Sequence, residues 1–131
     1  MRSLMPVRLL NSCVLKWPNR QVVDRAVRSW TVKQVKVKPD MIRLGYYGSY
    51  ARGDWGVGSD LDLIAVVSET VEPFERRLLE WDLNGFPVPT EIIVYSLPEW
   101  EDLERKDTKF FRMLKREVIW TYMRGGYEMN N

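Results

Sequence analysis

The sequence predicts an α+β domain in which helices cover a small β-sheet mainly on one side. Three short apolar runs have the composition of strands: residues 41–47, 61–67 and 91–95. Segments with helical periodicity separate them, in the order helix, strand, short helix, strand, helix, strand, helix. A chain of 131 residues, 45% of them hydrophobic, is expected to form one domain with its own core.

The first helix is predicted to begin after Asn19, whose side chain can cap a helix N-terminus. The residues that follow place one apolar stripe on the helix, as is typical of packing against a core: Val22, Val23, Ala26, Val27 and Trp30. We expect residues 1–18 to be an N-terminal extension and the core of the domain to span about residues 20–122.

Prolines indicate where two later helices begin. Pro73 can occupy the first turn of one, in which apolar residues recur at helical spacing: Phe74, Leu78 and Trp81. Pro98 opens another helical stretch from about residue 99. A last helix is predicted over residues 109–123, and residues 124–131 are expected to form a loose tail.

A glycine-serine turn follows the first predicted strand, within the segment GYYGSYARGDWGVGSDLDLIAVV that starts at residue 45. Gly48 lets the backbone approach a ligand, and Ser49 adds a hydroxyl and an N–H group. Ser49 is also expected to N-cap a short helix through Arg52, whose amide end attracts anions. We therefore interpret Gly48 and Ser49 as a phosphate-binding turn.

Two carboxylates open the next predicted strand. Asp60 and Asp62 lie two residues apart, so both are expected on one face of the strand, where a cation would relieve their repulsion. Hard oxygen ligands favour magnesium, which is often shared with substrate phosphates. An Asp-x-Asp pair alone is most often a solvated strand end. Its place beyond the turn, with Arg52 and Ser59 at fixed offsets, favours a nucleotide site.

This segment resembles the signature of the nucleotidyltransferase superfamily that includes DNA polymerase beta, and above all its small minimal nucleotidyltransferase (MNT) members. The resemblance covers about residues 20–122 and implies a nucleotidyltransferase fold with a small mixed sheet. It implies that four residues bind the nucleotide: Gly48, Ser49, Arg52 and Ser59.

In that family a third carboxylate from a neighbouring strand completes the site. Glu91 opens the run at residues 91–95 and stands where the family usually has aspartate, and its longer side chain can still reach a metal. The resemblance thus implies that Asp60, Asp62 and Glu91 are catalytic and bind magnesium, as two ions. It also implies ATP as substrate and transfer of AMP to an acceptor hydroxyl.

The composition excludes several other kinds of site. The chain has no histidine, which excludes a His-based triad and histidine-containing zinc sites. Cys13 is the only cysteine, so an intramolecular disulfide cannot form. The longest uncharged apolar run, residues 63–67, is too short to span a bilayer, and the N-terminus lacks the apolar stretch of a signal peptide. We therefore expect a cytoplasmic protein.

The net charge of +2 hides an asymmetry along the chain. Basic residues dominate up to residue 38, where Asp24 is the only acid, and acidic residues dominate residues 60–104. Solvated faces account for most of this pattern, and a basic face for a protein partner or an RNA is the alternative. The basic residues lack a series of interleaved aromatic stacking platforms, which disfavours nucleic acid as a direct ligand.

MNT proteins of this size are commonly paired with a HEPN-domain ribonuclease toxin, which they neutralise and can adenylylate. The resemblance implies this antitoxin role here. A binding protein that neutralises a HEPN partner by contact alone, with a vestigial site, is an alternative, but contact needs none of Gly48, Ser49, Asp60 and Asp62. A nucleotidyltransferase that modifies a small molecule is a third, and the short chain disfavours it.

Overall fold

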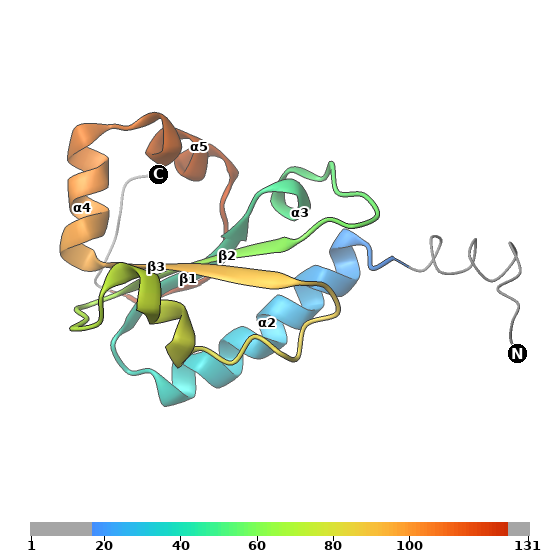
Figure 1. Ribbon diagram of the computed structural model, residues 1–131, viewed down its shortest axis with the longest axis horizontal. Helices are drawn as coiled ribbons and strands as arrows, with labels where there is room; N and C mark the ends of the chain where they lie inside the picture. Colours follow the sequence, from blue (N-terminus) through green and yellow to red (C-terminus); the bar gives the residue numbers. More distant parts are fainter. Residues whose placement is uncertain (1–16, 126–131) are drawn as a thin grey trace, which may run out of the picture.

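The computed structural model describes residues 17–125, and a four-stranded mixed sheet forms its centre (Figure 1). The strands are β1 (Met41–Tyr47), β2 (Leu61–Val67), β3 (Thr90–Ser96) and β4 (Ile119–Met123), in the order β3-β2-β1-β4. β1 pairs antiparallel with β2 and β4, whereas β2 and β3 are parallel. The predicted α+β class and mixed sheet are therefore confirmed. The expected extension up to residue 16 and the tail from residue 126 lie outside the described residues.

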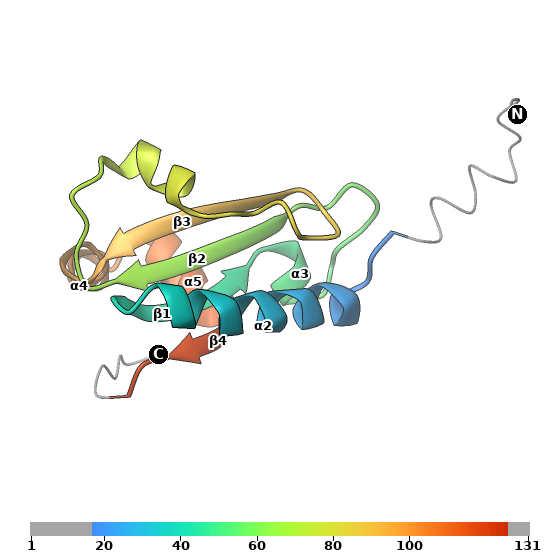
Figure 2. The same cartoon turned by 90° about the horizontal axis from the view of Figure 1, so that it is seen from below.

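Helices cover both faces of this sheet (Figures 1 and 2). On one face, α2 (Arg20–Val37) packs on the core through the fully buried Val23 and Val27. On the other face lie α4 (Leu97–Lys106) and α5 (Lys109–Glu117). This arrangement differs from the expected coverage of mainly one face. The physical reason is that β2 is a nearly continuous apolar run, the pattern of a strand buried on both sides.

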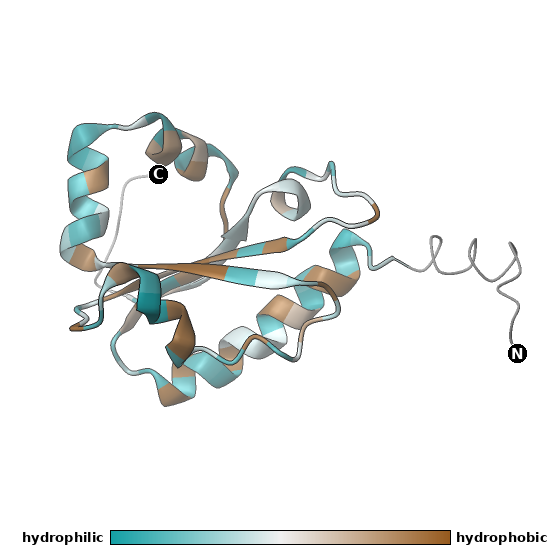
Figure 3. Ribbon diagram, in the orientation of Figure 1, coloured by the Kyte–Doolittle hydropathy of each residue, from teal (hydrophilic) through white to brown (hydrophobic). Residues whose placement is uncertain are grey.

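Hydropathy along the chain follows these two layers. Figure 3 shows hydrophilic and hydrophobic residues alternating along α2 and α4, as expected for helices with one face on the core. Within residues 17–125, no helix combines the length and the apolar character needed to cross a lipid bilayer.

Local capping signals place the starts of α2 and α4. The Asn19 side chain accepts a hydrogen bond from the backbone N–H of Val22, which begins α2 as predicted. Ser96 and Glu99 form a reciprocal capping box at the start of α4. The helix expected after Pro73 is the short 3-10 helix η1 (Phe74–Glu80).

The end of the chain differs from the prediction. The last helix ends at Glu117, and residues 119–123 form the edge strand β4 instead of continuing the predicted helix. All of these residues except Met123 are β-branched or aromatic, and the strand pairs with β1 beside Gly45. A Cβ built on Gly45 would overlap the carbonyl oxygen of Ile119, so glycine is what allows β4 to approach β1 here.

Candidate active site

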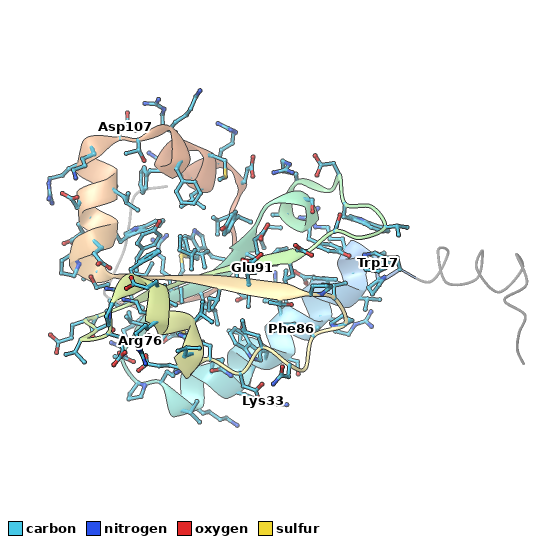
Figure 4. All side chains as sticks on the ribbon, in the orientation of Figure 1. Trp17, Lys33, Arg76, Phe86, Glu91 and Asp107 are labelled. Carbon is cyan, nitrogen blue, oxygen red and sulfur yellow. The ribbon has the colours of Figure 1, made fainter. Side chains whose placement is uncertain are left out.

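Strand pairing gathers three polar residues at one end of the sheet. Asp62 on β2 lies in register with Tyr47 on β1 and with Glu91 on β3. Ile64 and Ile93, two residues further along their strands, pack into the core under α4 and α5. Because side chains alternate along a strand, Asp62 and Glu91 face the same side of the sheet as these two isoleucines. Figure 4 shows the position of Glu91 on β3.

The glycine of the turn touches this group directly. Gly48 is buried, has φ +82°, and lies so close to Asp62 that a Cβ built on it would overlap Asp62 Oδ2. A side chain at this position would be strained by the backbone conformation and would collide with the carboxylate. The predicted phosphate turn and one predicted metal-binding carboxylate are thus immediate neighbours in space.

The short helix after the turn begins one residue earlier than expected. In α3 (Ser49–Arg52) the N-cap is Gly48, not Ser49, because the Gly48 carbonyl already accepts hydrogen bonds from the N–H groups of Ala51 and Arg52. Ser49 is therefore the first helical residue. The N–H groups of Ser49 and Tyr50 have no acceptor within such a helix, so they point out of its start.

Tyr50 anchors α3 to the rest of the domain. Its ring is buried and stacks on Trp55, with centroids 5.8 Å apart. Its hydroxyl accepts a hydrogen bond from Trp17 Nε1 and donates one to the carbonyl of Pro18. These contacts hold the turn in place from the side opposite Asp62.

The carboxylates influence one another electrostatically. Burial raises the pKa of Asp62 above its ordinary value, and the negative charges of Glu91 and Asp60 raise it further. The positive charge of Arg52 opposes this rise in the pKa. Burial also raises the pKa of Tyr47 to about 12, and the charges of Asp62 and Glu91 contribute. Asp60, Asp62 and Glu91 therefore form one negatively charged cluster.

The cluster has the donor chemistry of a magnesium site. Its carboxylate oxygens are hard ligands, and a divalent cation would relieve the repulsion that raises the pKa of Asp62. As the side chains stand, no group of three His, Cys, Asp or Glu residues in the described part of the chain is arranged to hold a metal ion. Asp60 and Glu91 are exposed, so both side chains can turn toward an ion beside Asp62.

Two residues assigned to the nucleotide from the sequence have partners within the protein. Arg52 Nε donates to Asp54 at 3.0 Å, and Arg52 Nη1 donates to Glu117 at the end of α5 at 3.2 Å. The Ser59 hydroxyl accepts a hydrogen bond from the N–H of Gly56 at 2.8 Å. Both residues therefore shape the loop between the turn and the two aspartates, and their contact with a nucleotide stays a prediction.

A groove beside β3 contains residues that the sequence reasoning missed. It has a volume of about 270 Å³ and extends from Tyr47, Asp62 and Glu91 toward η1. Tyr47 could have been identified as the last strand residue before the turn, on the same face as Asp62. Arg77 was visible only as a rare cation in an acidic stretch. A larger cavity, about 480 Å³, lies at the other end of β2 and contains none of these carboxylates.

Comparison with known proteins identifies the family. Residues 28–119, more than half of the chain, match the nucleotidyltransferase domain. A comparison with functionally curated proteins gave no match. The fold is similar to the crystal structure of a candidate nucleotidyltransferase from Sulfolobus solfataricus, with a TM-score of 0.56 and 16% identity over 82% of this chain and 86% of that one.

Two further solved structures show weaker similarity. One is a toxin-antitoxin with AMP-PNP, with a TM-score of 0.47 and 11% identity. The other is a mutant of the toxin-antitoxin MntA-HpeT, with a TM-score of 0.44 and 10% identity. Each match covers 75% of this chain and 74% of the other. On the domain match over residues 28–119, this chain belongs to the nucleotidyltransferase domain family.

Proposed function

We propose that this protein is a cytoplasmic, magnesium-dependent enzyme that transfers AMP from ATP to a hydroxyl of a HEPN-domain toxin, and that it acts as the antitoxin of this partner. One observation carries the proposal: Asp62 lies against the buried, positive-φ Gly48 and in register with Glu91. A turn able to receive phosphates and a cluster able to hold cations thereby come into contact at Asp62. A protein that neutralises its partner by contact alone needs neither feature.

Different residues of the chain would bind the magnesium ions and the triphosphate. Magnesium ions held by Asp60, Asp62 and Glu91 would neutralise phosphate charge and stabilise the entering and leaving oxygens. The turn at Gly48 and Ser49 receives the triphosphate, because no side chain intervenes at Gly48 and backbone N–H groups point outward.

The chemical step is a substitution at the α-phosphorus. The acceptor oxygen forms a bond to this phosphorus, and the bond from the phosphorus to the pyrophosphate oxygen breaks. The electron pair of the broken bond leaves with pyrophosphate. Glu91, an exposed member of the cluster, takes the proton of the acceptor hydroxyl as general base.

Calorimetric titration with ATP and magnesium tests the nucleotide site. Wild-type protein should bind ATP only with the metal, and the double variant Asp60→Asn, Asp62→Asn should lose this binding. Glu69→Gln with Glu101→Gln makes the same change in charge at two exposed positions outside the cluster and should bind like wild type. Unchanged affinity in the aspartate variant would refute the metal assignment.

Labelled ATP tests the transfer. The protein, magnesium and ATP labelled at the α-phosphate are incubated with the HEPN partner, and the partner is analysed by mass spectrometry. Label on the partner, absent with the double variant, is expected. A partner that is neutralised but carries no label would establish the contact-only antitoxin instead.

A further inference from the structure

The groove beside β3 leads away from the carboxylate cluster. Tyr47, Asp62 and Glu91 line one end of it, and Phe74 and Leu78 of η1 line the other. Glu75 and Arg77 of η1 and residues 92–94 in the middle of β3 complete the lining. Figures 1 and 2 show η1 running alongside β3, and the C-terminal half of η1 is hydrophobic in Figure 3. This wall of the groove is therefore apolar and carries an acidic side chain.

Arg77 fixes the wall in place. Its side chain is only 8% exposed, and Nη1 donates to the carbonyl of Val94 on β3 at 3.0 Å. Two further bonds, of 2.6 and 3.1 Å, join its guanidinium to both carboxylate oxygens of Glu99. Nε donates to the carbonyl of Glu72 at 3.0 Å. Because Arg77 ties η1 to β3 and α4, the groove is a fixed feature of the fold.

The phosphate turn reaches the cluster from the β1 side, whereas the groove, apart from Tyr47, is lined by residues of β2, β3 and η1. In the sheet order, β2 lies between β1 and β3, so Asp62 lies between the turn that follows β1 and the groove beside β3. A displacement at phosphorus needs the entering and leaving groups on opposite sides of the reacting atom. If the triphosphate occupies the turn, the groove lies where the entering group must come from.

We propose that this groove receives the acceptor, and that the acceptor is a hydroxyl side chain on a protein segment with apolar and cationic neighbours. The proposal rests on the nucleotidyl transfer proposed above. The volume of about 270 Å³ is at the lower limit of pockets that enclose a small molecule, which span about 300–1,000 Å³. The groove therefore fits one side chain of a larger molecule better than a whole small substrate.

The side chains that line the groove determine which kind of acceptor segment can bind there. Leu78 is 46% exposed and offers apolar surface to a partner. Glu75, which lies outside the metal-binding cluster, favours a cationic segment and repels the phosphates of a nucleic acid. Leu78 and Glu75 are accordingly positioning residues for the acceptor, and the groove that they line does not include Gly48 or Ser49.

A panel of synthetic peptides tests the proposal. Each peptide carries one Tyr, Ser or Thr flanked by Leu and Lys, or the same residue flanked by Leu and Glu. A short RNA and an aminoglycoside serve as the other kinds of acceptor. With magnesium and α-labelled ATP, the Lys-flanked peptides should be labelled about tenfold more than the Glu-flanked ones. No labelled peptide, or label on the RNA or the aminoglycoside alone, would overturn the proposal.

Two adjacent leucines provide the matched control. Leu78→Glu places a charge in the apolar wall and should reduce labelling about tenfold without changing ATP binding. Leu79 is 68% exposed on the same helix and, among the described residues, is not part of the groove lining. Leu79→Glu should therefore label like wild type. Equal losses in both variants would overturn the assignment of the groove.

Charge reversal gives a readout that a merely structural role would not produce. Glu75→Lys should shift the preference from Lys-flanked toward Glu-flanked peptides, and an unchanged preference would contradict the role of Glu75.

Calorimetry separates this inference from the proposed function. Wild-type protein that does not bind ATP with magnesium refutes both, whereas normal ATP binding with no effect of the groove variants refutes only the acceptor site.

Discussion

Gly48 and Asp62 are in such close contact that no side chain fits between them. The two residues belong to neighbouring strand ends, and a Cβ built on Gly48 would overlap Asp62 Oδ2. The backbone of Gly48, with φ +82°, is also one that other residues rarely adopt. Position 48 is therefore restricted both by conformation and by space, and the restriction lies at the centre of the proposed site.

Replacing Gly48 should remove ATP binding and destabilise the fold. Gly48→Ala pushes the Asp62 carboxylate away and strains the turn, and we expect a loss of about 1–3 kcal/mol in the free energy of unfolding. Denaturant unfolding and calorimetry with ATP and magnesium measure the two effects. Gly56→Ala is the matched control, because a Cβ built on Gly56 meets nothing within 4 Å. Wild-type affinity in Gly48→Ala would show that the turn is not the phosphate site.

The ionised Asp62 side chain should lower the free energy of unfolding at neutral pH. Its pKa in the folded protein is raised above the ordinary value of 3.8, so the folded state holds the proton more tightly than the unfolded state does. The free energy of unfolding therefore falls as the pH rises from about 4 through the raised pKa. Asp62→Asn removes this loss and should raise the melting temperature at pH 7 by about 2–4 °C.

The pH profile separates this effect from other consequences of the substitution. At pH 3 Asp62 is protonated in both the folded and the unfolded state of the wild type. The increase in melting temperature caused by Asp62→Asn should therefore disappear at this pH. Thermal melts at both pH values measure it, with Glu69→Gln as an exposed control outside the cluster. A gain of equal size at pH 3 and pH 7 would contradict the electrostatic origin.

Glu91 should matter for transfer and not for nucleotide binding. Glu91→Gln keeps the shape of the side chain but cannot accept a proton, so we expect transfer to fall by about 10²–10⁴-fold while ATP with magnesium still binds. Single-turnover labelling of the acceptor measures the first quantity and calorimetry the second. Glu101→Gln, an exposed change on α4, is the control. Equal transfer rates for Glu91→Gln and wild type would remove Glu91 from the reaction.

Arg77 should contribute strongly to the stability of the fold, and its neighbour Arg76 should contribute little. Arg77→Ala removes hydrogen bonds to two backbone carbonyls and to Glu99, and should lower the free energy of unfolding by about 2–4 kcal/mol. Arg76 is 65% exposed and has a long 3.8 Å contact with Glu72, so Arg76→Ala should change stability by less than about 0.5 kcal/mol. Denaturant unfolding of both variants measures the difference, and similar values would contradict the anchoring role of Arg77.

The stabilisation by Arg77 should depend on pH. The hydrogen bonds and charge of Arg77 lower the pKa of Glu99 below its ordinary value of 4.5 in the folded protein. The Arg77–Glu99 pair therefore contributes fully to the free energy of unfolding at a pH above 4.5. This contribution is lost as the pH falls through the lowered pKa of Glu99. The gap between wild type and Arg77→Ala should narrow in acid, and a constant gap would assign the effect to the backbone bonds alone.

Several features were accessible from the sequence because they depend on residues close together in the chain. The cap at Asn19 and the start of α4 follow from side chains that bond to N–H groups within three residues. The proposed phosphate turn and the aspartate pair were recognised for the same reason, from glycine after one strand and carboxylates at the start of the next. The family could be inferred because its signature is local.

Other features depend on pairing between distant segments, and only the tertiary structure decided them. Residues 119–123 have helical spacing as well as β-branched and aromatic side chains, and pairing with β1 beside Gly45 makes them a strand. The coverage of both sheet faces and the anchoring of η1 by Arg77 likewise need contacts across the chain. Glu91 meets Asp62 only through the register of β2 with β3, where a shift of one residue would turn its side chain to the other face.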